Sequence, residues 1–521
     1  MKKLNFDNRF TNELPADPEA RNTRRQVMGA CFSWVEPTPV SAPTLLSYSH
    51  EAASLFDLSD GDCASDAFLQ TFSGNQLLDG MRSYAMCYGG HQFGNWAGQL
   101  GDGRAINLGE AVNEKGQSWA LQLKGAGPTP YSRTADGLAV LRSSVREYLC
   151  SEAMFHLGVP TTRALSLVTT GEQVMRDVMY DGNPDYELGA VVCRVAPSFI
   201  RFGSFQIFAS RNDVTSLKAL TDFTIKEHFS HLLKDHEAGS KELYLAWFDE
   251  VCQLTVTMVV QWMRVGFVHG VMNTDNMSIH GLTIDYGPYG WLDDFNPDWT
   301  PNTTDAQNRR YRYSQQPNIA LWNCYQLANS LFLLIDDADA LEARLHDFQS
   351  SYESQWQSMM ADKLGFTTTE ESDVELFERL EVLLKVVETD MTIFYRKLAS
   401  QDLSLDTFKD AYYSDSDFPE GYNAQMSKWL ADYQQRLAKE TVDFQVRKEA
   451  MNKVNPKYVF RNYLAQQATE KAEAGDYSMI NELLDLFRNP YDEQPDREHY
   501  AVKRPEWART KVGCSMLSCS S

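Results

Sequence analysis

The sequence has little of what marks secreted or nucleic-acid-binding proteins. Its nine cysteines are an odd number and form no CxxC pair, so they indicate neither a disulfide framework nor a zinc site. Basic residues are scarce, with 48 Lys and Arg against 71 Asp and Glu, and the net charge of −23 repels phosphates at long range. We therefore expect that neither nucleic acid nor an anionic membrane is the main partner.

Long apolar runs and targeting segments are also missing. The longest uncharged apolar stretch, residues 251–263, contains Thr and Gln residues and is shorter than the roughly 20 residues that a membrane span needs. The first residues contain no apolar run of the kind found in secretion signals, and the acidic residues among them are atypical of a transit peptide: Asp7, Glu13, Asp17 and Glu19. The sequence therefore predicts a cytoplasmic protein without a membrane span.

What is present is ample core material, in a pattern that changes along the chain. Of the 521 residues, 43% are hydrophobic and 12% aromatic. Residues 96–210 contain strand-like patches, whereas the pattern from about residue 215 onward is helical, with Gly266 as the stop of one long helix. The stretches 338–398 and 421–488 are predicted to continue as long amphipathic helices.

The most informative segment is "HGVMNTDNMSIHGLTIDYGP", residues 269–288. His269 and Asn276 have the spacing of the protein kinase catalytic loop, and Asp285 precedes Tyr and Gly as the metal-binding aspartate of kinases precedes Phe and Gly. Asn276 and Asp285 are therefore candidate ligands of Mg²⁺. The position of the kinase base, however, is Val271, which cannot accept a proton.

Asp275 is the carboxylate left in this loop, and it is the candidate replacement base. The alternative is an aspartate that caps a turn. We interpret His269 as a core histidine without a catalytic role.

A lysine and a glutamate upstream fit the ion pair that fixes the phosphate-binding lysine in kinase folds. Lys124 ends the strand-like "WALQLK", and Glu147, 23 residues later, falls on the small-residue face of a predicted helix that stops at Gly158. An exposed lysine and a solvated glutamate are the alternatives.

Glycines and arginines suggest phosphate contacts. Gly101 and Gly103 precede Arg104 in "GQLGDGR", which fits either a phosphate-binding loop or a simple hairpin turn. Arg194 and Arg201 lie in an apolar segment that we predict to be a strand pair, where they need anions: phosphates or carboxylates of the protein. Together these features predict an α+β fold, namely a protein kinase-like two-lobe fold with an N-terminal extension and additional C-terminal helices.

The predicted domains are an extension over residues 1–95 packed on the core, an N-lobe over 96–210, a helical C-lobe over 211–400, and a C-terminal helical region over 401–521 that ends in a cysteine-containing tail.

The order of several long motifs resembles the selenoprotein O family of pseudokinases. They are "YGGHQFGNWAGQLGDGRAINLGE", "LQLKGAG", "YSRTADGLAVLRSSVREYLCSEAM", the 269–288 segment, "NPKYVFRNYLAQ" and a cysteine third from the end. The resemblance implies transfer of AMP from ATP to Ser, Thr or Tyr hydroxyls of proteins, with ATP inverted relative to kinases and Mg²⁺ or Mn²⁺ as the metal. Transfer of UMP with Mn²⁺ is also attributed to bacterial members, and redox-related proteins are one expected group of protein substrates.

Residue by residue, the resemblance implies that Asp275 is the proton acceptor and that Asn276 and Asp285 are metal ligands. It assigns nucleotide contacts to Gly101, Gly103, Arg104, Lys124, Asp136, Gly137, Arg194, Arg201 and Asp285. The resemblance implies that in the inverted orientation the γ-phosphate lies deep among Lys124, Arg194 and Arg201. A base at the kinase position would then have no attacking hydroxyl group to deprotonate.

The chain departs from the family in one place. Bacterial members can carry a cysteine after the DFG-like motif that pairs with the C-terminal cysteine, but here "DYGPYGWLDDFNPDWTPN" has none, and the sixteenth residue after Asp285 is Pro301. We predict instead that Cys519 pairs under oxidation with Cys514, in a polar tail, or with a cysteine of a client protein.

Two other classes of function remain open. A phosphotransferase acting on proteins or small molecules would use a similar loop, but Val271 argues against it. A catalytically silent pseudokinase scaffold would not need Lys124, Glu147, Asn276 and Asp285, all of which are present.

Overall fold

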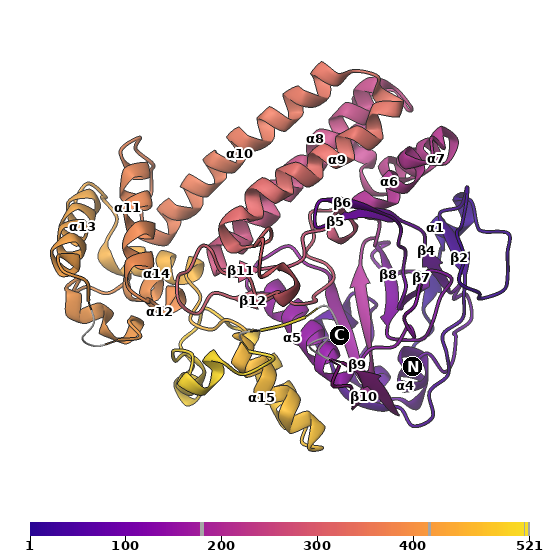
Figure 1. Ribbon diagram of the computed structural model, residues 1–521, viewed down its shortest axis with the longest axis horizontal. Helices are drawn as coiled ribbons and strands as arrows, with labels where there is room; N and C mark the ends of the chain where they lie inside the picture. The colour runs from indigo at the N-terminus through magenta and orange to yellow at the C-terminus, as the bar shows by residue number, and fades with distance from the viewer. Residues whose placement is uncertain (178–181, 415–417, 515, 519–521) are drawn as a thin grey trace.

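The computed structural model describes residues 1–177, 182–414, 418–514 and 516–518. Figure 1 shows a sheet-rich half, drawn in indigo to magenta, and a helical half formed largely by later residues. The sheet has the strand order β2-β4-β7-β8-β10-β9-β3, with β1 paired to β7, and all its pairs are antiparallel. Its strands are β1 (Asn5–Phe6), β2 (Phe32–Trp34), β3 (Thr44–Tyr48), β4 (Tyr84–Met86), β7 (Ala105–Val112), β8 (Ser118–Lys124), β9 (Arg163–Arg176) and β10 (Asp185–Ala196).

The predicted N-terminal extension thus contributes four strands to the same sheet as residues 96–210. A separate hairpin, β5 (Gly89–Gln92) with β6 (Asn95–Gln99), crosses the predicted boundary at residue 95 and reaches the helical half, where β5 contacts α6 (Phe202–Ser210). Short helices connect the early strands: α1 (Arg9–Glu13), α2 (His50–Ser54), α3 (Asp60–Cys63) and α4 (Asp66–Phe72).

One helix, α5 (Leu141–His156), packs against β9 and β10. It ends at Leu157, and Gly158 follows with a φ of +74°, a left-handed conformation that glycine adopts without strain. The predicted helix and its stop are confirmed. Two C-terminal helices, α15 (Asn462–Glu473) and α16 (Ser478–Phe487), also pack against α5.

The helical half is built around α8 (Lys241–Val265), which packs against α9 (Gln316–Ile335) and α10 (Ala338–Leu364). The Ser240 hydroxyl accepts a hydrogen bond from the Leu243 N–H at its start, and Gly266 ends it with a φ of +77°. By length and composition alone α8 could cross a membrane, but 61% of its apolar segment is buried inside the protein, as in a core helix.

The remaining helices and two short strands complete the helical half. The predicted stretches 338–398 and 421–488 are helical but broken into shorter helices, and two short strands pair beside the 269–288 segment. The bounds are α7 (Val214–His228), α11 (Asp373–Val386), α12 (Met391–Lys397), α13 (Tyr422–Leu437), α14 (Phe444–Val454), β11 (Phe267–Val268) and β12 (Gly290–Trp291).

The tail lies against the segment that follows the DFG-like motif. The Leu517 N–H donates to the Pro301 carbonyl at 3.1 Å, and the Thr303 N–H donates to the Leu517 carbonyl at 2.8 Å. Cys514 is only 4% exposed, and its carbonyl accepts from the Asn462 side chain at 2.9 Å. The sequence predicted a polar tail without secondary structure around Cys514, and the structure shows that this cysteine nevertheless packs into the core. Its pairing with Cys519 stays a prediction, because Cys519 lies outside the described residues.

Candidate active site

A cavity of about 890 Å³ is lined by residues of both halves. Segments that are far apart in the sequence meet in it. Every residue that the sequence assigned to the nucleotide, the metal or proton transfer lines this cavity, except Glu147: Gly101, Gly103, Arg104, Lys124, Asp136, Gly137, Arg194, Arg201, Asp275, Asn276 and Asp285.

Glu147 lies behind the cavity and binds two of its cations. It is 1% exposed in the middle of α5, and its carboxylate forms ion pairs with Lys124 at the end of β8 and with Arg194 Nε at 2.6 Å. Burial lowers the pKa of Lys124 to about 8, with the neighbouring arginines adding to the effect and Glu147 opposing it. The Lys124–Glu147 pair expected from the sequence is present, and it continues to Arg194.

Asp285 is held by two arginines. Arg194 Nη1 lies 2.9 Å from Asp285 Oδ1, and Arg201 forms an ion pair with the other carboxylate oxygen. Burial would raise the pKa of Asp285, but Arg201, Arg194 and Lys124 together outweigh it and hold that pKa well below its usual range. Of the two anions that the sequence left open for these arginines, the structure shows a carboxylate of the protein.

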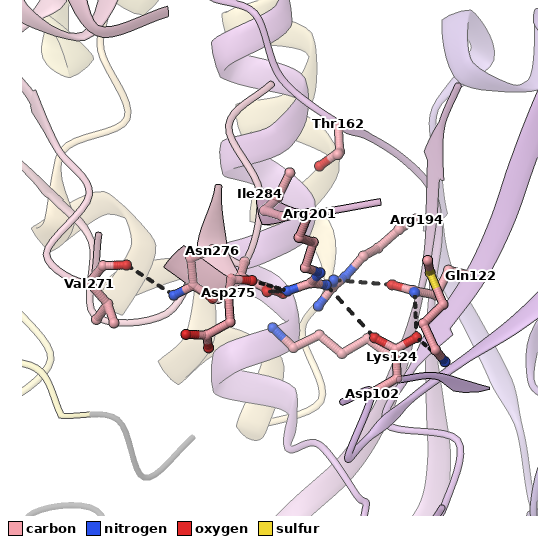
Figure 2. Close-up of polar contacts among 12 residues, drawn as sticks. Asp102, Gln122, Lys124, Thr162, Arg194, Arg201, Val271, Asp275, Asn276 and Ile284 are labelled. Atoms are coloured by element: carbon pink, nitrogen blue, oxygen red, sulfur yellow. Dashed lines mark hydrogen bonds and ion pairs between the residues drawn. The ribbon is translucent and has the colours of Figure 1, made fainter. Parts of the chain in front are cut away.

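Arg201 corrects one sequence prediction. Arg194 lies on β10, but Arg201 does not belong to a paired strand, because it is the N-cap residue of α6. Figure 2 shows Arg194 and Arg201 approaching each other from these two elements, with Asp275 and Asn276 opposite them. A single turn between the strand and the helix therefore brings both guanidinium groups to one point.

Asp102 is a site residue that sequence reasoning missed. It is 1% exposed between Gly101 and Gly103, and its Oδ2 accepts from the Met86 N–H at 2.9 Å, from Asn107 Nδ2 at 3.1 Å and from Gln122 Nε2 at 3.4 Å. These bonds tie the glycine loop to the sheet. Its Oδ1 faces Arg201 Nη2 at 3.9 Å. The only signal in the sequence was a charged residue inside a glycine loop.

The catalytic-loop candidates lie in a short 3-10 turn, Thr274–Asn276. Asp275 Oδ2 accepts from Gln92 Nε2 at 3.2 Å, and its Oδ1 is buried and has no hydrogen-bond partner among the residues that the structure describes. Burial raises the pKa of Asp275 to about 6. The Arg201 guanidinium donates to the Asp275 backbone carbonyl at 2.8 Å, which links the loop to the arginine pair.

The two predicted metal ligands offer donors that fit a divalent cation. Asn276 Nδ2 donates to the Val271 carbonyl at 2.9 Å (Figure 2), so the amide nitrogen is engaged and the amide oxygen is the atom left for a metal. Asp285 contributes a carboxylate to the same cavity. An amide oxygen and a carboxylate are hard ligands of the kind that Mg²⁺ and Mn²⁺ bind.

His269 has the structural role that the sequence suggested. It is 1% exposed, its Nε2–H donates to the Ile284 carbonyl at 2.9 Å, and its Nδ1 accepts from the Val271 N–H at 3.3 Å. The imidazole therefore ties the start of the 269–288 segment to the backbone just before Asp285. Val271 itself lines the cavity without an ionisable group.

Residues 21–488 match the family model described as "Protein adenylyltransferase SelO". The chain belongs to this family. It is 58% identical over 536 residues to the protein nucleotidyltransferase YdiU of Rhodopirellula baltica, with 99% of each chain covered. The proteins of the same name from Azoarcus sp. (strain BH72) and Flavobacterium johnsoniae are 57% and 53% identical, each over the full length of both chains. SelO membership confirms the predicted kinase-like α+β fold and identifies the chain as a nucleotidyltransferase.

Proposed function

We propose that this SelO-family protein transfers AMP from ATP to Ser, Thr or Tyr hydroxyl groups of other proteins. The observation that carries the proposal is the combination of Val271 at the kinase base position with a buried aspartate, Asp275, which lines the same cavity and whose backbone carbonyl accepts from Arg201. The site therefore has a proton acceptor, but in a different place from that of a kinase. A reaction at a phosphorus other than the γ-phosphorus accounts for this shift.

The cations at the deep end of the cavity suit the phosphates of ATP. Lys124, Arg194 and Arg201 are all buried, and guanidinium groups bind phosphate oxygens in a bidentate manner. Gly101 and Gly103 allow backbone N–H groups to approach without a side chain in the way. On nucleotide binding, the phosphates would replace Asp285 as the anion that neutralises the two arginines.

Asn276 and Asp285 would hold the divalent cation. When bound, it supplies positive charge that stabilises the negative charge developing on the phosphoryl oxygens. Release from Arg194 and Arg201 frees the Asp285 carboxylate for this role. Replacement of Asp285 by the phosphates would thus leave the arginines bound to the nucleotide and the aspartate free to bind the metal.

Asp275 would take the proton of the acceptor hydroxyl. The hydroxyl oxygen attacks the α-phosphorus, the bond from that phosphorus to the oxygen bridging to the β-phosphate breaks, and pyrophosphate leaves. The hydroxyl proton passes to the Asp275 carboxylate. With a pKa of about 6, Asp275 is mostly ionised at neutral pH and remains a useful base.

Labelled nucleotides test this proposal directly. With ATP labelled at the α-phosphate, we expect label on protein substrates in a lysate or on the enzyme itself, and with γ-labelled ATP we expect none. A parallel reaction with α-labelled UTP and Mn²⁺ measures UMP transfer. Stable γ-label without α-label would overturn the proposal in favour of a phosphotransferase.

A further inference from the structure

A second cavity, of about 400 Å³, lies where the two halves meet. It shares no lining residue with the candidate active site. Its walls come from α1, from strands β4, β7 and β8, from the segment 197–199 that joins β10 to α6, and from α7 and His280 of the helical half. A molecule bound there would touch both halves of the protein. Its volume is within the usual range of small-molecule sites.

A continuous run of aromatic rings forms one wall of this cavity. The ring of Tyr84 stacks on Phe10 with centroids 5.3 Å apart, and Phe10 meets Phe223 edge-on at 5.7 Å. Phe223 then contacts His228 at 6.2 Å, and His228 contacts His280 at 5.0 Å. All five side chains line the cavity. The faces of such rings carry partial negative charge and attract cations.

A carboxyl group in the same cavity has no ion-pair partner among the described residues. Glu110 is 9% exposed, and its Oε1 accepts from the Tyr84 hydroxyl at 3.0 Å, while its Oε2 is buried without a hydrogen-bond partner in the described parts of the chain. A buried acceptor left unpaired is destabilising, and more so if it is charged. Burial raises the pKa of Glu110 to about 7; the charge of Asp7 adds to this rise, while hydrogen bonds from the Tyr84 hydroxyl and the Phe10 N–H oppose it.

The other ionisable groups of the cavity do not supply that cation. Arg9 is engaged by two carboxylates, Glu227 at 2.7 Å and Asp7 at 2.6 Å. Burial lowers the pKa of His228 to about 4 and that of His280 to about 3, so both imidazoles are neutral at physiological pH. When Glu110 is ionised, its charge is therefore not balanced by any other lining residue, so the cavity favours a cation over an anion.

We propose that this cavity binds a small organic ammonium ion, with its N–H groups on Glu110 Oε2 and its carbon skeleton against the ring wall. A carboxylate together with several aromatic faces is the usual chemistry for recognising such cations. His280 Nε2, which is also buried without a hydrogen-bond partner, is available for a further polar contact. The proposal does not depend on the transferase reaction, because no residue of the active-site cavity is involved.

Isothermal titration calorimetry of the full-length protein tests this with benzylammonium as the probe and benzyl alcohol as its neutral counterpart. We expect one benzylammonium per chain and at least tenfold weaker binding of benzyl alcohol. Glu110→Gln keeps an acceptor for the Tyr84 hydroxyl but removes the charge, so it should weaken benzylammonium binding at least tenfold. The matched control is Glu381→Gln: burial also raises the pKa of Glu381 to about 7, but this residue does not line the cavity.

Equal binding of the alcohol, unchanged binding by the Glu110 variant, or no binding of benzylammonium to the wild type would each overturn the proposal. A second measurement needs no variant of Glu110. In wild-type protein with ¹³C-labelled histidine, benzylammonium should shift the imidazole signals of His228 and His280, assigned through His228→Asn and His280→Asn. Shifts confined to other histidines would place the cation elsewhere.

Discussion

Asp285 and the two arginines that hold it are the most informative group at the scale of single residues. Lys124, Glu147, Arg194, Asp285 and Arg201 form a chain of alternating charges that is neutralised almost entirely from within the protein. Removing one member of a buried pair is costly, because the partner keeps an uncompensated charge. If Asp285 leaves the two arginines, its own charge and theirs are both uncompensated. A bound metal ion neutralises Asp285 and the nucleotide phosphates neutralise the arginines, so the binding of metal and nucleotide should be strongly coupled.

Asp285→Ala tests this coupling. The variant should lose transfer activity, because a metal ligand is gone, and Mg²⁺ should no longer strengthen nucleotide binding. In EDTA, however, it should bind ATP at least as tightly as the wild type, since Arg194 and Arg201 no longer have to leave a carboxylate. Asn276→Ala is the matched control: it removes the other ligand but leaves the arginine pairs, and should show wild-type affinity in EDTA. Calorimetric titration of the wild type and both variants, with Mg²⁺ and in EDTA, measures the six affinities; weaker metal-free binding by Asp285→Ala than by the wild type would contradict the exchange.

Asp275→Ala separates proton transfer from nucleotide binding. Loss of the base should reduce turnover about 10²–10⁴-fold, the range found for general bases, while the affinity for ATP stays near the wild-type value. Steady-state transfer of α-label and equilibrium binding of ATP measure the two effects. Full activity in this variant would mean that Asp275 only shapes its turn.

Sequence reasoning at this scale succeeded where the chemistry is local. The spacing from His269 to Asn276, and the small-residue face that Glu147 shares, placed side chains that the structure indeed brings to one cavity or its wall. It failed for Arg201, which it placed on a strand, and for Asp102, whose partners Met86, Asn107 and Gln122 come from three different strands. Such long-range contacts leave no periodic trace in the sequence.

At the scale of elements, helix α5 is central because it carries Glu147, and the elements packed around α5 therefore determine where Glu147 lies. The helix packs against β9 and β10 and against the C-terminal helices α15 and α16; Figure 1 shows α15 close to α5. The Tyr148 hydroxyl shares a hydrogen bond of 2.9 Å with Ser47, whose hydroxyl donates to Asn481 of α16 at 2.8 Å. The C-terminal helices therefore help to keep α5, and with it the Lys124–Glu147 pair, in place.

Leu483→Ala in α16 should loosen α5. Leu483 is fully buried, and a buried Leu→Ala change costs about 2–5 kcal/mol of unfolding free energy. Hydrogen–deuterium exchange should rise in residues 141–156 more than in α8. The control is Leu327→Ala, at a fully buried site in α9, which should raise exchange in α8 more than in residues 141–156. Equal exchange of α5 in both variants would show that α16 does not support it.

Strong stop signals decided which elements could be predicted. Gly158 and Gly266 mark the ends of α5 and α8, and both ends were predicted correctly. The stretch 338–398 was predicted to contain long amphipathic helices without stated ends, and in the structure it is divided at Gly365 and again between α11 and α12. The second break has no glycine or proline; there Asp390 caps α12 by accepting from the Ile393 N–H at 3.0 Å, and buried ion pairs with Arg461 hold it.

At the scale of the whole molecule, buried carboxyl groups set the pH dependence of stability. Burial raises the pKa of Glu110 from 4.5 to about 7, so the folded protein keeps this group protonated where the unfolded chain has ionised it. Its contribution to stability is complete below pH 4.5 and is lost as the pH rises to about 7. A shift of this size corresponds to about 3 kcal/mol.

Glu110→Gln should therefore flatten the fall in unfolding free energy between pH 5 and pH 7. Urea unfolding followed by circular dichroism at several pH values measures the slope, and the difference from wild type isolates this group. Glu381→Gln should have an effect of the same sign, and the double variant the sum of both, because the two sites do not share a cavity. Identical slopes for wild type and Glu110→Gln would contradict the assignment.

The contact between the tail and residues 301–303 can form only late in synthesis of the chain. The Thr303 hydroxyl donates to the carbonyl of Leu517, a residue 214 positions later in the chain, at 3.0 Å. Strands and helices of the sheet half can form as the ribosome releases them. The hydrogen bonds of Pro301 and Thr303 cannot form at that stage, because their backbone partner, Leu517, has not yet been synthesised. The wall of the cavity next to Thr304 therefore gains these contacts only after the tail has left the ribosome.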